Sequence, residues 1–425
     1  MDSFINNNKE RIFITGGNKL CGSVSISGAK NAALPLMALS LIINKDFTLS
    51  NVPDLADTRL MLELLNDLGI QTRWENDQVQ FNGVAQKNEA SYDLVRQMRA
   101  SILVLGPLLA SQGLAKVPLP GGCAIGSRPI DLHVMVMEAL GANINFDSGF
   151  IIGSVPSEGL RGGKINFPKI SVGATESAIM TAVLAKGQTV ISNAAKEPEI
   201  VDLVDCLNKA GASIIGAGTN TIIINGVKKL NAIKHHVVAD RIEAGSFAIA
   251  SSITMGNIEI KNIIPNNLEF FLRVLKKTGS KIEIYKNSVN ISSFKRPSPY
   301  DVITEEHPGF PTDLQAQYMT LMSIADGTSE IVENIFENRF MHVPELIRMG
   351  AKISVNKQKA TVRGIKGLKA VKVMASDLRA SMSLILGGLV AQGTTEVDGI
   401  NHLDRGYENL EDKLSNLGAD IRRSI

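Results

Sequence analysis

The sequence predicts a two-domain α/β protein built from six copies of a strand–helix–strand–helix–strand–strand unit. Its 425 residues exceed what one hydrophobic core usually organises. A short segment recurs six times at a nearly constant interval. Within each interval, apolar spacing typical of a helix gives way to the two-residue period of a strand. Three copies per domain would give two domains of about 200 residues each.

The recurring segment is Leu-x-x-x-Gly, with Met once in place of Leu, and its copies lie about 70 residues apart. Each copy ends a helical pattern. Over 200–207, apolar residues occupy positions i, i+3, i+4 and i+7, and Gly211 stands where a left-handed helix cap belongs. Two segments with alternating apolar residues follow each copy and predict a pair of strands. After Gly350, for example, they are 352–355 and 360–363. The six glycines are Gly69, Gly141, Gly211, Gly279, Gly350 and Gly418.

A second helix and strand share this period, as in the helical pattern over 178–185 and the strand pattern over 188–192. The first helix of the first unit begins near Lys30, so residues 1–29 are expected to supply strands to another unit. We therefore expect one discontinuous domain of residues 1–29 and 238–425 and a second domain of residues 30–237. The active site is expected in the cleft between them.

Composition excludes several classes of protein. Forty-four basic and 42 acidic residues leave a net charge of +2 without any block of like charge, which disfavours nucleic acid as a partner. No apolar run approaches the roughly 18 residues that span a membrane, and no signal peptide is visible. Three cysteines without CxxC spacing indicate a reducing compartment, and six scattered histidines indicate no metal site. We expect a cytoplasmic protein without metal or membrane contact.

The repeats also place charged residues at the starts of helices. Helix N-termini carry partial positive charge and unpaired N–H groups. If these ends face one cleft, together with their Lys and Arg side chains, the cleft would bind a small molecule with several phosphates or carboxylates. Taken singly, each residue is as easily an ordinary cap or surface residue. The first helices are expected to begin near Lys30, Arg99, Ser171, Arg241, Asp313 and Arg379, and the second near Arg59, Arg128, Glu197, Asn266, Arg339 and Arg405.

Two local patterns suggest chemistry. Glycines and prolines over 120–129 frame Cys123, and Arg128 five residues later would favour the reactive thiolate, although a lone cysteine in a turn is often only a small apolar side chain. Asp313 follows Pro311 and Thr312, a pattern that favours a helix N-cap, with a general base as the rival interpretation. Cys21 and Cys206 are interpreted as structural thiols. ATP- and dinucleotide-binding motifs are not complete anywhere, so no cofactor is expected.

Nine segments resemble the enolpyruvyl transferase family, and within it the UDP-N-acetylglucosamine 1-carboxyvinyltransferases. They run in order through the chain, which makes the resemblance specific. It implies a fold of two inside-out α/β barrel domains, each with pseudo-threefold symmetry, around a cleft. The matching segments are 28–35, 98–101, 123–133, 171–175, 197–202, 310–313, 336–342, 376–379 and 404–408.

The resemblance implies transfer of enolpyruvate from phosphoenolpyruvate to the 3′-hydroxyl of UDP-N-acetylglucosamine, the first committed step of peptidoglycan precursor synthesis. Cys123 resembles the acid that protonates the methylene carbon, and Asp313 resembles the base for the sugar hydroxyl. Lys30 and Arg405 complete the implied catalytic set. The implied phosphoenolpyruvate ligands are Lys30, Asn31, Arg128, Arg379 and Arg405. The implied nucleotide-sugar contacts are Asn31, Arg99, Arg128, Pro129, Ile130, Asp131, Leu132, Lys169, Ile170, Ser171, Val172, Asp313 and Ile335.

Lys196 stands where the family pattern has Arg, and the N-terminus is several residues longer. The protein is expected to be a monomer. Three alternatives remain open at this point. They are the sister enzyme acting on shikimate 3-phosphate, a ring-like clamp on DNA, and a nucleotide-sugar sensor without catalysis. The DNA clamp is disfavoured by the charge balance.

Overall fold

A computed structural model describes residues 10–43, 45–120 and 130–424. The described chain divides into two compact units, one formed by residues 28–238 and the other by residues 10–27 with 239–424. The domain boundaries expected from the sequence, after residues 29 and 237, lie within two residues of the boundaries in the structure. Cys123, Arg128 and Pro129 lie outside the described residues.

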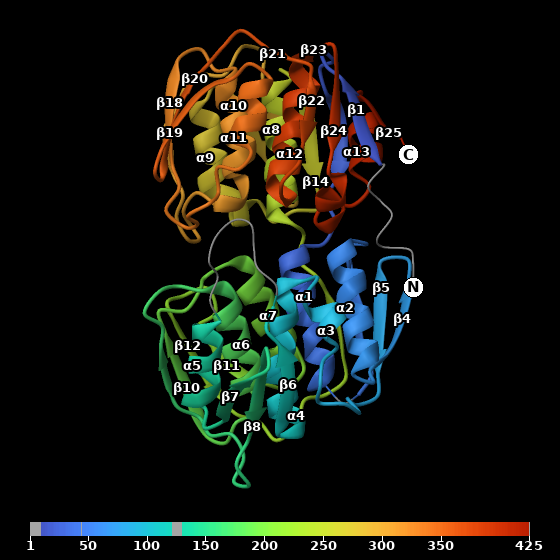
Figure 1. The fold of residues 1–425 in the computed structure, drawn as a ribbon, viewed down its shortest axis with the longest axis vertical. Coiled ribbons are helices and arrows are strands. Elements are labelled where there is room, and N and C mark those ends of the chain that lie inside the picture. Colours follow the sequence, from blue (N-terminus) through green and yellow to red (C-terminus); the bar gives the residue numbers. More distant parts are fainter. Residues whose placement is uncertain (1–9, 44, 121–129, 425) are drawn as a thin grey trace. The chain divides into compact units, whose positions relative to one another are not determined.

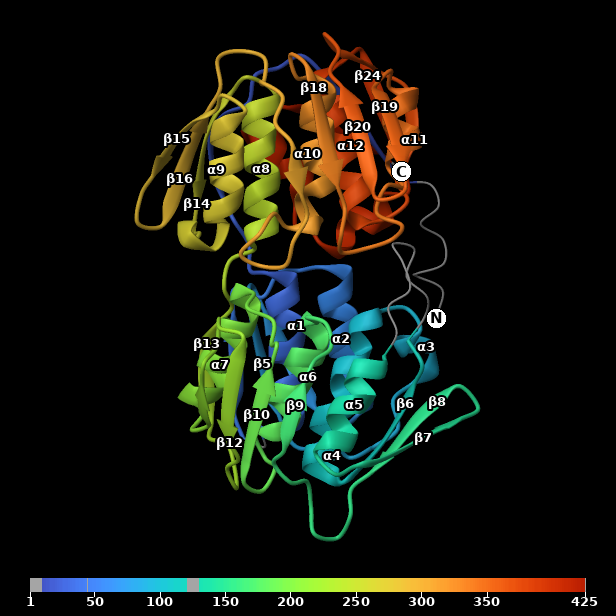
Figure 2. The same ribbon diagram turned by 90° about the vertical axis from the view of Figure 1, so that its left-hand side faces the viewer.

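The unit of residues 28–238 contains three sheets around a group of helices, with the sheets on the outside (Figures 1 and 2). The sheet orders are β13-β3-β5-β4, β6-β8-β7 and β11-β12-β10-β9. Its strands are β3 (Phe47–Ser50), β4 (Gln71–Glu75), β5 (Gln78–Asn82), β6 (Leu114–Pro118), β7 (Asn143–Asp147), β8 (Phe150–Ser154), β9 (Lys164–Asn166), β10 (Gln188–Ser192), β11 (Ser213–Ile215), β12 (Thr221–Asn225) and β13 (Ile233–His236). Its helices are α1 (Lys30–Ala38), α2 (Ala56–Asp67), α3 (Tyr92–Val95), α4 (Leu105–Gln112), α5 (Asp131–Ala139), α6 (Val172–Ala182) and α7 (Pro198–Lys209).

The other unit repeats this arrangement and uses the first strands of the chain. β1 pairs with β24 and β25, and β2 pairs with β14, so residues 10–27 add strands to the sheets of residues 239–424. The sheet orders are β22-β24-β1-β25, β15-β16-β14-β2 and β17-β18-β20-β19, with a small β21-β23 pair. The strands are β1 (Arg11–Thr15), β2 (Cys21–Ser25), β14 (Asn257–Lys261), β15 (Lys281–Ile284), β16 (Ser288–Ser292), β17 (Val302–Ile303), β18 (Thr328–Val332), β19 (Lys352–Asn356), β20 (Lys359–Arg363), β21 (Leu368–Lys369), β22 (Lys372–Met374), β23 (Ala391–Gln392), β24 (Thr394–Asp398) and β25 (Asp420–Ser424). The helices are α8 (Arg241–Ile253), α9 (Glu269–Lys277), α10 (Gln315–Ser323), α11 (Val343–Arg348), α12 (Leu378–Val390) and α13 (Leu410–Asn416).

The central helices have no exposed face, which explains their small and apolar sequences. Every residue of α6 from Ala174 to Ala182 is buried, as is every residue of α8 from Ile242 to Ile253. A helix surrounded by other elements is apolar all round instead of amphipathic. Each unit therefore has its own core, with helices inside and sheets outside.

The six-unit α/β prediction is confirmed, including its glycine caps. All six repeated glycines have φ between +91° and +103°, the left-handed region that favours glycine.

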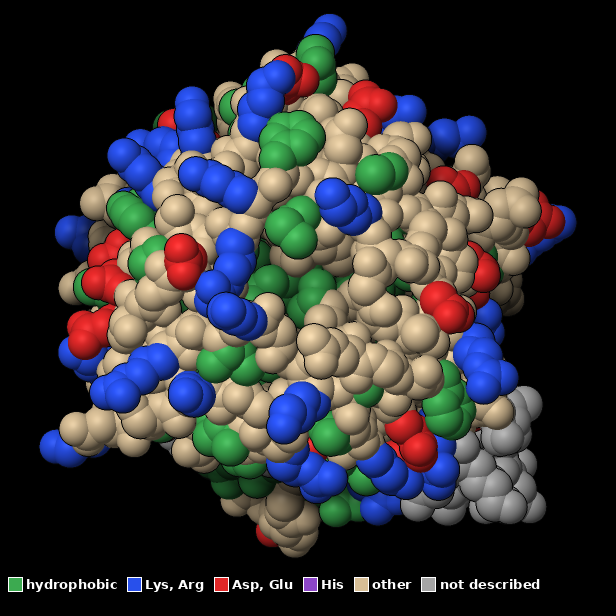
Figure 3. All heavy atoms as spheres, turned by 90° about the horizontal axis from the view of Figure 1, so that it is seen from above, with side chains coloured by type: hydrophobic (Ala, Val, Ile, Leu, Met, Phe, Trp, Pro, Cys, Tyr) green, Lys and Arg blue, Asp and Glu red, His purple; other side chains and the backbone are tan. Residues whose placement is uncertain are grey.

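On the face drawn in Figure 3, Lys and Arg side chains are spread among Asp and Glu side chains and do not gather in one place. In the described part of the chain, no helix is long and apolar enough to cross a membrane.

Three expected helix starts were wrong. α2 begins at Ala56, before Arg59, because the hydroxyl of Thr58 accepts a hydrogen bond from the N–H of Leu55 and fixes an earlier first turn. Arg339 lies in a turn before α11, and Arg405 ends the 3₁₀ turn Ile400–Arg405 before α13. The connections to these two helices thus contain an extra turn, which puts both arginines outside the helix N-termini.

Candidate active site

The carboxylate of Asp313 is bound by two arginines. Asp313 lies in the 3₁₀ turn Thr312–Leu314 that leads into α10. Its Oδ1 accepts a hydrogen bond from Nη2 of Arg339 at 2.8 Å, and its Oδ2 accepts one from Nη2 of Arg379 at 2.8 Å. The Asp313 side chain is 25% exposed, whereas each arginine side chain is 5% exposed. One carboxylate therefore pairs with two buried guanidinium groups and is still partly exposed.

The N-cap interpretation of Asp313 was wrong. Pro311 occupies the cap position of the turn, and the oxygens of Asp313 turn to the arginines. Charge-assisted bonds to guanidinium are stronger than bonds to a neutral backbone N–H, which explains the choice. Asp377 is the residue that caps a helix here, since its Oδ1 accepts from the N–H groups of Arg379 and Ala380 at 2.9 and 3.0 Å.

Arg379 is held by Tyr407 as well as by Asp313. Its Nη1 lies 3.4 Å from the hydroxyl of Tyr407, and its guanidinium lies 5.7 Å from the centre of that ring. Burial alone would lower the pKa of Arg379, but the charge of Asp313, its hydrogen bond and the smaller effects of Tyr407 and Asp240 together outweigh burial, and the pKa is raised overall. Arg379 is therefore a permanent cation at the start of α12.

A buried hydroxyl network supports these groups. The Tyr407 hydroxyl lies 2.8 Å from Oγ of Ser246 on α8, and Nε2 of Gln317 on α10 donates to it at 3.2 Å. Gln317 also donates to the carbonyl oxygen of Asp313 at 2.9 Å, and burial raises the pKa of Tyr407. This network was not expected from the sequence. Its signals were the place of Gln317 one helical turn after Asp313 and of Tyr407 two residues after Arg405.

Two histidines close to the arginines of this unit have lowered pKa values. Burial lowers the pKa of His342 to about 4, and the nearby charge of Arg339 lowers it further against the opposite effect of Asp377. Burial and then the charge of Arg405 lower the pKa of His402. Both shifts favour the neutral imidazole, so Arg339 and Arg405 supply positive charge here and these two histidines do not.

In the unit of residues 28–238, two other predicted residues lie at the start of α1. Nζ of Lys30 is 3.2 Å from Oδ2 of Asp57, which lies in the first turn of α2, and the two side chains are 13% and 6% exposed. Asn31, the next residue, is exposed. Arg99 begins the 3₁₀ turn Arg99–Val104 and is half-buried.

The start of α5 packs against α6, and the backbone of Gly173 in the first turn of α6 closely approaches the ring of His133. Nδ1 of His133 lies 2.8 Å from Oγ of Ser177, which joins the first turn of α5 to α6. Ser171 caps α6, because its Oγ accepts from the N–H of Ala174 at 3.3 Å. The structure thus brings two groups of predicted residues into one region of this unit, Ile130, Asp131 and Leu132 with Lys169, Ile170, Ser171 and Val172.

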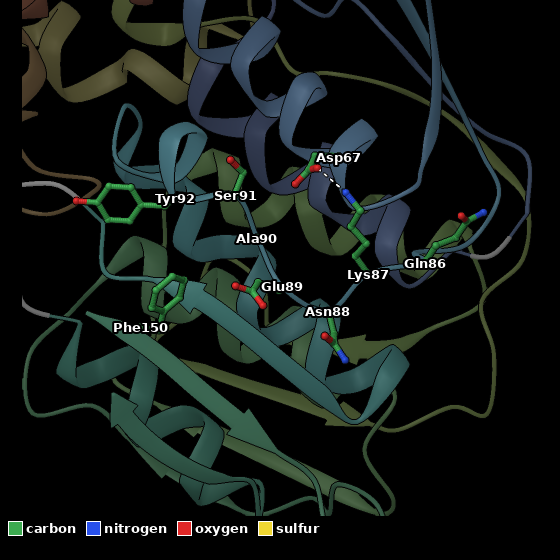
Figure 4. Close-up of a pocket in the computed structure, with 9 residues that line it drawn as sticks. All are labelled: Asp67, Gln86, Lys87, Asn88, Glu89, Ala90, Ser91, Tyr92 and Phe150. Atoms are coloured by element: carbon green, nitrogen blue, oxygen red, sulfur yellow. Dashed lines mark hydrogen bonds and ion pairs between the residues drawn. The ribbon is translucent and has the colours of Figure 1, made fainter. Parts of the chain in front are cut away.

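A shallow groove of about 650 Å³ in this unit is lined by none of the predicted residues that the structure describes. Figure 4 shows it between the ion-paired side chains of Asp67 and Lys87 and the rings of Tyr92 and Phe150. The groove is polar and open, unlike the enclosed apolar pockets typical of small-molecule sites. Within the described ranges, no group of three His, Cys, Asp or Glu residues could hold a metal ion. We therefore do not place the site at this groove.

Comparison with known proteins places the chain in a family. Residues 14–414 match the family model described as EPSP synthase (3-phosphoshikimate 1-carboxyvinyltransferase). The chain is 50% identical over 422 residues to a UDP-N-acetylglucosamine 1-carboxyvinyltransferase of Zymomonas mobilis, covering 97% of this chain and 99% of the relative. The enzyme of the same name from Desulfosudis oleivorans is 52% identical over 415 residues, with the same coverage. The chain belongs to the enolpyruvyl transferase family. As a member of this family, it is an enzyme and a transferase.

Solved structures confirm the enolpyruvyl transferase fold. The enolpyruvyl transferase NikO from Streptomyces tendae matches 98% of this chain and 99% of its own, with a TM-score of 0.87 at 23% identity. EPSP synthase from Acinetobacter baumannii matches 98% of this chain and 100% of its own, with a TM-score of 0.76 at 16% identity. At these identities the likeness concerns the fold alone.

Proposed function

We propose that this enzyme transfers the enolpyruvyl group of phosphoenolpyruvate to the 3′-hydroxyl of UDP-N-acetylglucosamine and releases phosphate. The observation that carries the proposal is about 50% identity, over 97% of the chain, to relatives named for this reaction. The description of the family model favours a second candidate, which acts on shikimate 3-phosphate. The acceptor therefore has to be tested directly.

The proposed chemistry is an addition followed by an elimination. The sugar oxygen bonds to C2 of phosphoenolpyruvate while its proton leaves to a base, and C3 gains a proton from an acid. Loss of a proton from C3 then re-forms the double bond as the C2–O bond to phosphate breaks. We assign Asp313 as the base and Cys123 as the acid, the latter also able to add covalently to phosphoenolpyruvate.

Support for the base comes from the contacts of Asp313. Two guanidinium groups at 2.8 Å favour its ionised form, which is the form that accepts a proton. Its partial exposure allows a ligand to approach, and the two bonds fix its orientation before the substrate binds. Electrostatic preorganisation of this kind is commonly the largest contribution to catalysis.

The remaining assignments concern the residues that bind the two substrates. Lys30, Asn31, Arg128, Arg379 and Arg405 are proposed to bind phosphoenolpyruvate and to stabilise the charged tetrahedral intermediate. The nucleotide sugar is proposed to contact Asn31, Arg99, Arg128 to Leu132, Lys169 to Val172, Asp313 and Ile335. These residues belong to both units, so the proposal requires both units to act on one pair of substrates.

The wider role follows from the reaction. We propose that the enzyme works in the cytoplasm as a monomer without metal or cofactor. Its product would enter peptidoglycan precursor synthesis and thus support cell-wall growth, cell shape and cell division. The epoxide fosfomycin is proposed to alkylate Cys123.

The test is phosphate release from phosphoenolpyruvate, measured with UDP-N-acetylglucosamine, with shikimate 3-phosphate and with no acceptor. Release that requires the nucleotide sugar is the expected result. Release with shikimate 3-phosphate instead would favour the second candidate. Cys123→Ser should abolish or severely slow release, and full activity of that variant would remove the role assigned to Cys123.

A further inference from the structure

Glu333 is a fully buried carboxylate that uses both of its oxygens. It follows β18 directly and is 1% exposed. Its Oε1 accepts hydrogen bonds from the N–H groups of Ile335 and Phe336 at 2.9 and 3.2 Å and from the hydroxyl of Thr304 at 2.9 Å. Its Oε2 accepts from the hydroxyl of Thr312 at 2.8 Å. Burying a charge costs several kcal/mol unless such bonds compensate it, so these partners fix the position of the side chain.

The partners of Glu333 belong to two segments with different proposed tasks. Ile335, which is proposed to contact the nucleotide sugar, lies in the segment 334–336. Thr312 directly precedes Asp313, the proposed base. Thr304 follows β17, and its hydroxyl also accepts from the N–H of Asn334 at 2.9 Å, so it supports the segment of Ile335.

A second set of contacts joins the same two segments. Arg339 donates to Asp313 at 2.8 Å, and its guanidinium lies 5.5 Å from the ring centre of Phe336. The contacts therefore form a closed ring from Glu333 through Thr312, Asp313, Arg339 and Phe336 and back to Glu333. A closed ring of contacts restrains each member more strongly than one contact would.

We infer that Glu333 is a positioning residue that holds Asp313 at a fixed spacing from the segment of Ile335. The inference rests on the proposed function and adds a residue with its own task to it. A base must keep its distance from a sugar hydroxyl whose place is set by contacts elsewhere on the nucleotide sugar. A displacement of about 1 Å can cost on the order of 100-fold in rate, so a buried link between these segments would matter for turnover.

Two matched variants, Thr312→Val and Thr304→Val, test this inference. Each keeps the shape of the side chain and removes one hydroxyl that donates to Glu333. Thr312 is next to Asp313, whereas Thr304 supports the segment of Ile335. In phosphate-release assays, Thr312→Val should lower kcat about ten-fold and leave the KM for UDP-N-acetylglucosamine within about two-fold. Thr304→Val should raise that KM about three-fold or more and leave kcat within about two-fold. Glu333→Gln should change both constants.

Thermal unfolding of each variant supplies the control for a merely structural role. Similar losses of thermal stability in the two valine variants, with kcat and KM unchanged, would overturn the inference. So would the same kinetic change in both variants. Failure of the unaltered enzyme to release phosphate with the nucleotide sugar would overturn the proposed function, and the inference with it, so the two failures are distinguishable.

Discussion

Asp313 and Arg379 lie 66 residues apart in the sequence and form a 2.8 Å ion pair at the starts of α10 and α12. These two helices occupy equivalent places in neighbouring repeat units. The repeat therefore explains why the two residues meet, and the buried guanidinium explains why a carboxylate is needed there. A second bond of 2.8 Å, to Arg339, makes Asp313 the common partner of two buried cations.

Replacing Asp313 with Asn should damage both stability and activity. Loss of the carboxylate removes the ion-pair partner of two buried guanidinium groups, which should cost about 3 kcal/mol in the free energy of unfolding. Loss of the proposed base should lower kcat at least about 100-fold. Denaturant unfolding and phosphate release measure the two effects.

Asp326→Asn is the matched control for this variant. Asp326 also pairs with an arginine, at 3.1 Å, but its side chain is 79% exposed. Exposed pairs contribute little, so stability and turnover should be nearly unchanged. An Asp313→Asn enzyme with the stability and kcat of this control would contradict both assigned roles.

Tyr407→Phe tests the support of Arg379. The variant keeps the ring beside the guanidinium and removes the hydroxyl that contacts Ser246, Gln317 and Arg379. We expect the free energy of unfolding to fall by about 1 kcal/mol and the KM for phosphoenolpyruvate to rise several-fold. Ser246→Ala removes the same 2.8 Å bond from the other side but does not touch Arg379. It should therefore lower stability similarly and leave that KM unchanged; equal KM values in the two variants would exclude the role of Tyr407.

The fold could be predicted because its signals are local. Gly211 and its five equivalents mark helix ends in the sequence, and the left-handed φ of each confirms that reading. The strand pairs that follow each cap obey a two-residue period. The extra turns before α11 and α13 escaped prediction, because a 3₁₀ turn has no long-range apolar period that distinguishes it from a first helical turn.

The contacts of the site could not be predicted from the same signals. Pattern alone assigned Asp313 to a helix cap, since an acid at a helix start usually has that task. Its actual partners, Arg339 and Arg379, come from 26 and 66 residues away, and Glu333 likewise joins segments distant in sequence. Such bonds depend on how repeat units pack. The resemblance to a family identified Asp313, but neither it nor any spacing identified Glu333.

Cysteine labelling should separate the two described thiols. Cys206 is fully buried in α7, and burial raises the pKa of its thiol far above the ordinary value, whereas Cys21 is exposed at the start of β2. Thiolate is the reactive form, so iodoacetamide at pH 8 should modify Cys21 in the folded protein and Cys206 only after unfolding. Peptide mass spectrometry measures both sites. Rapid labelling of Cys206 under native conditions would contradict its place in the core.

The buried pair Glu243–Lys413 predicts how stability depends on pH. Oε1 of Glu243 lies 2.6 Å from Nζ of Lys413, and Oε2 accepts from the N–H of Ser27 at 3.0 Å. Burial raises the pKa of Glu243 from 4.5 to about 7, although Lys413 acts in the opposite direction. The folded state then binds this proton more tightly than the unfolded state does, so the contribution of Glu243 to stability should fall as pH rises from about 4.5 to about 7.

Glu243→Gln mimics the protonated side chain at every pH and isolates this effect. Relative to the unaltered enzyme, the variant should gain stability as pH rises from 5 to 8, by an amount that does not exceed about 3 kcal/mol. Glu283→Gln, in an exposed pair with Lys281, is the control and should show a much smaller dependence. Thermal unfolding across this pH range measures the difference. A stability difference that is constant with pH, or that shrinks as pH rises, would show that Lys413 keeps Glu243 ionised in the folded state despite its burial.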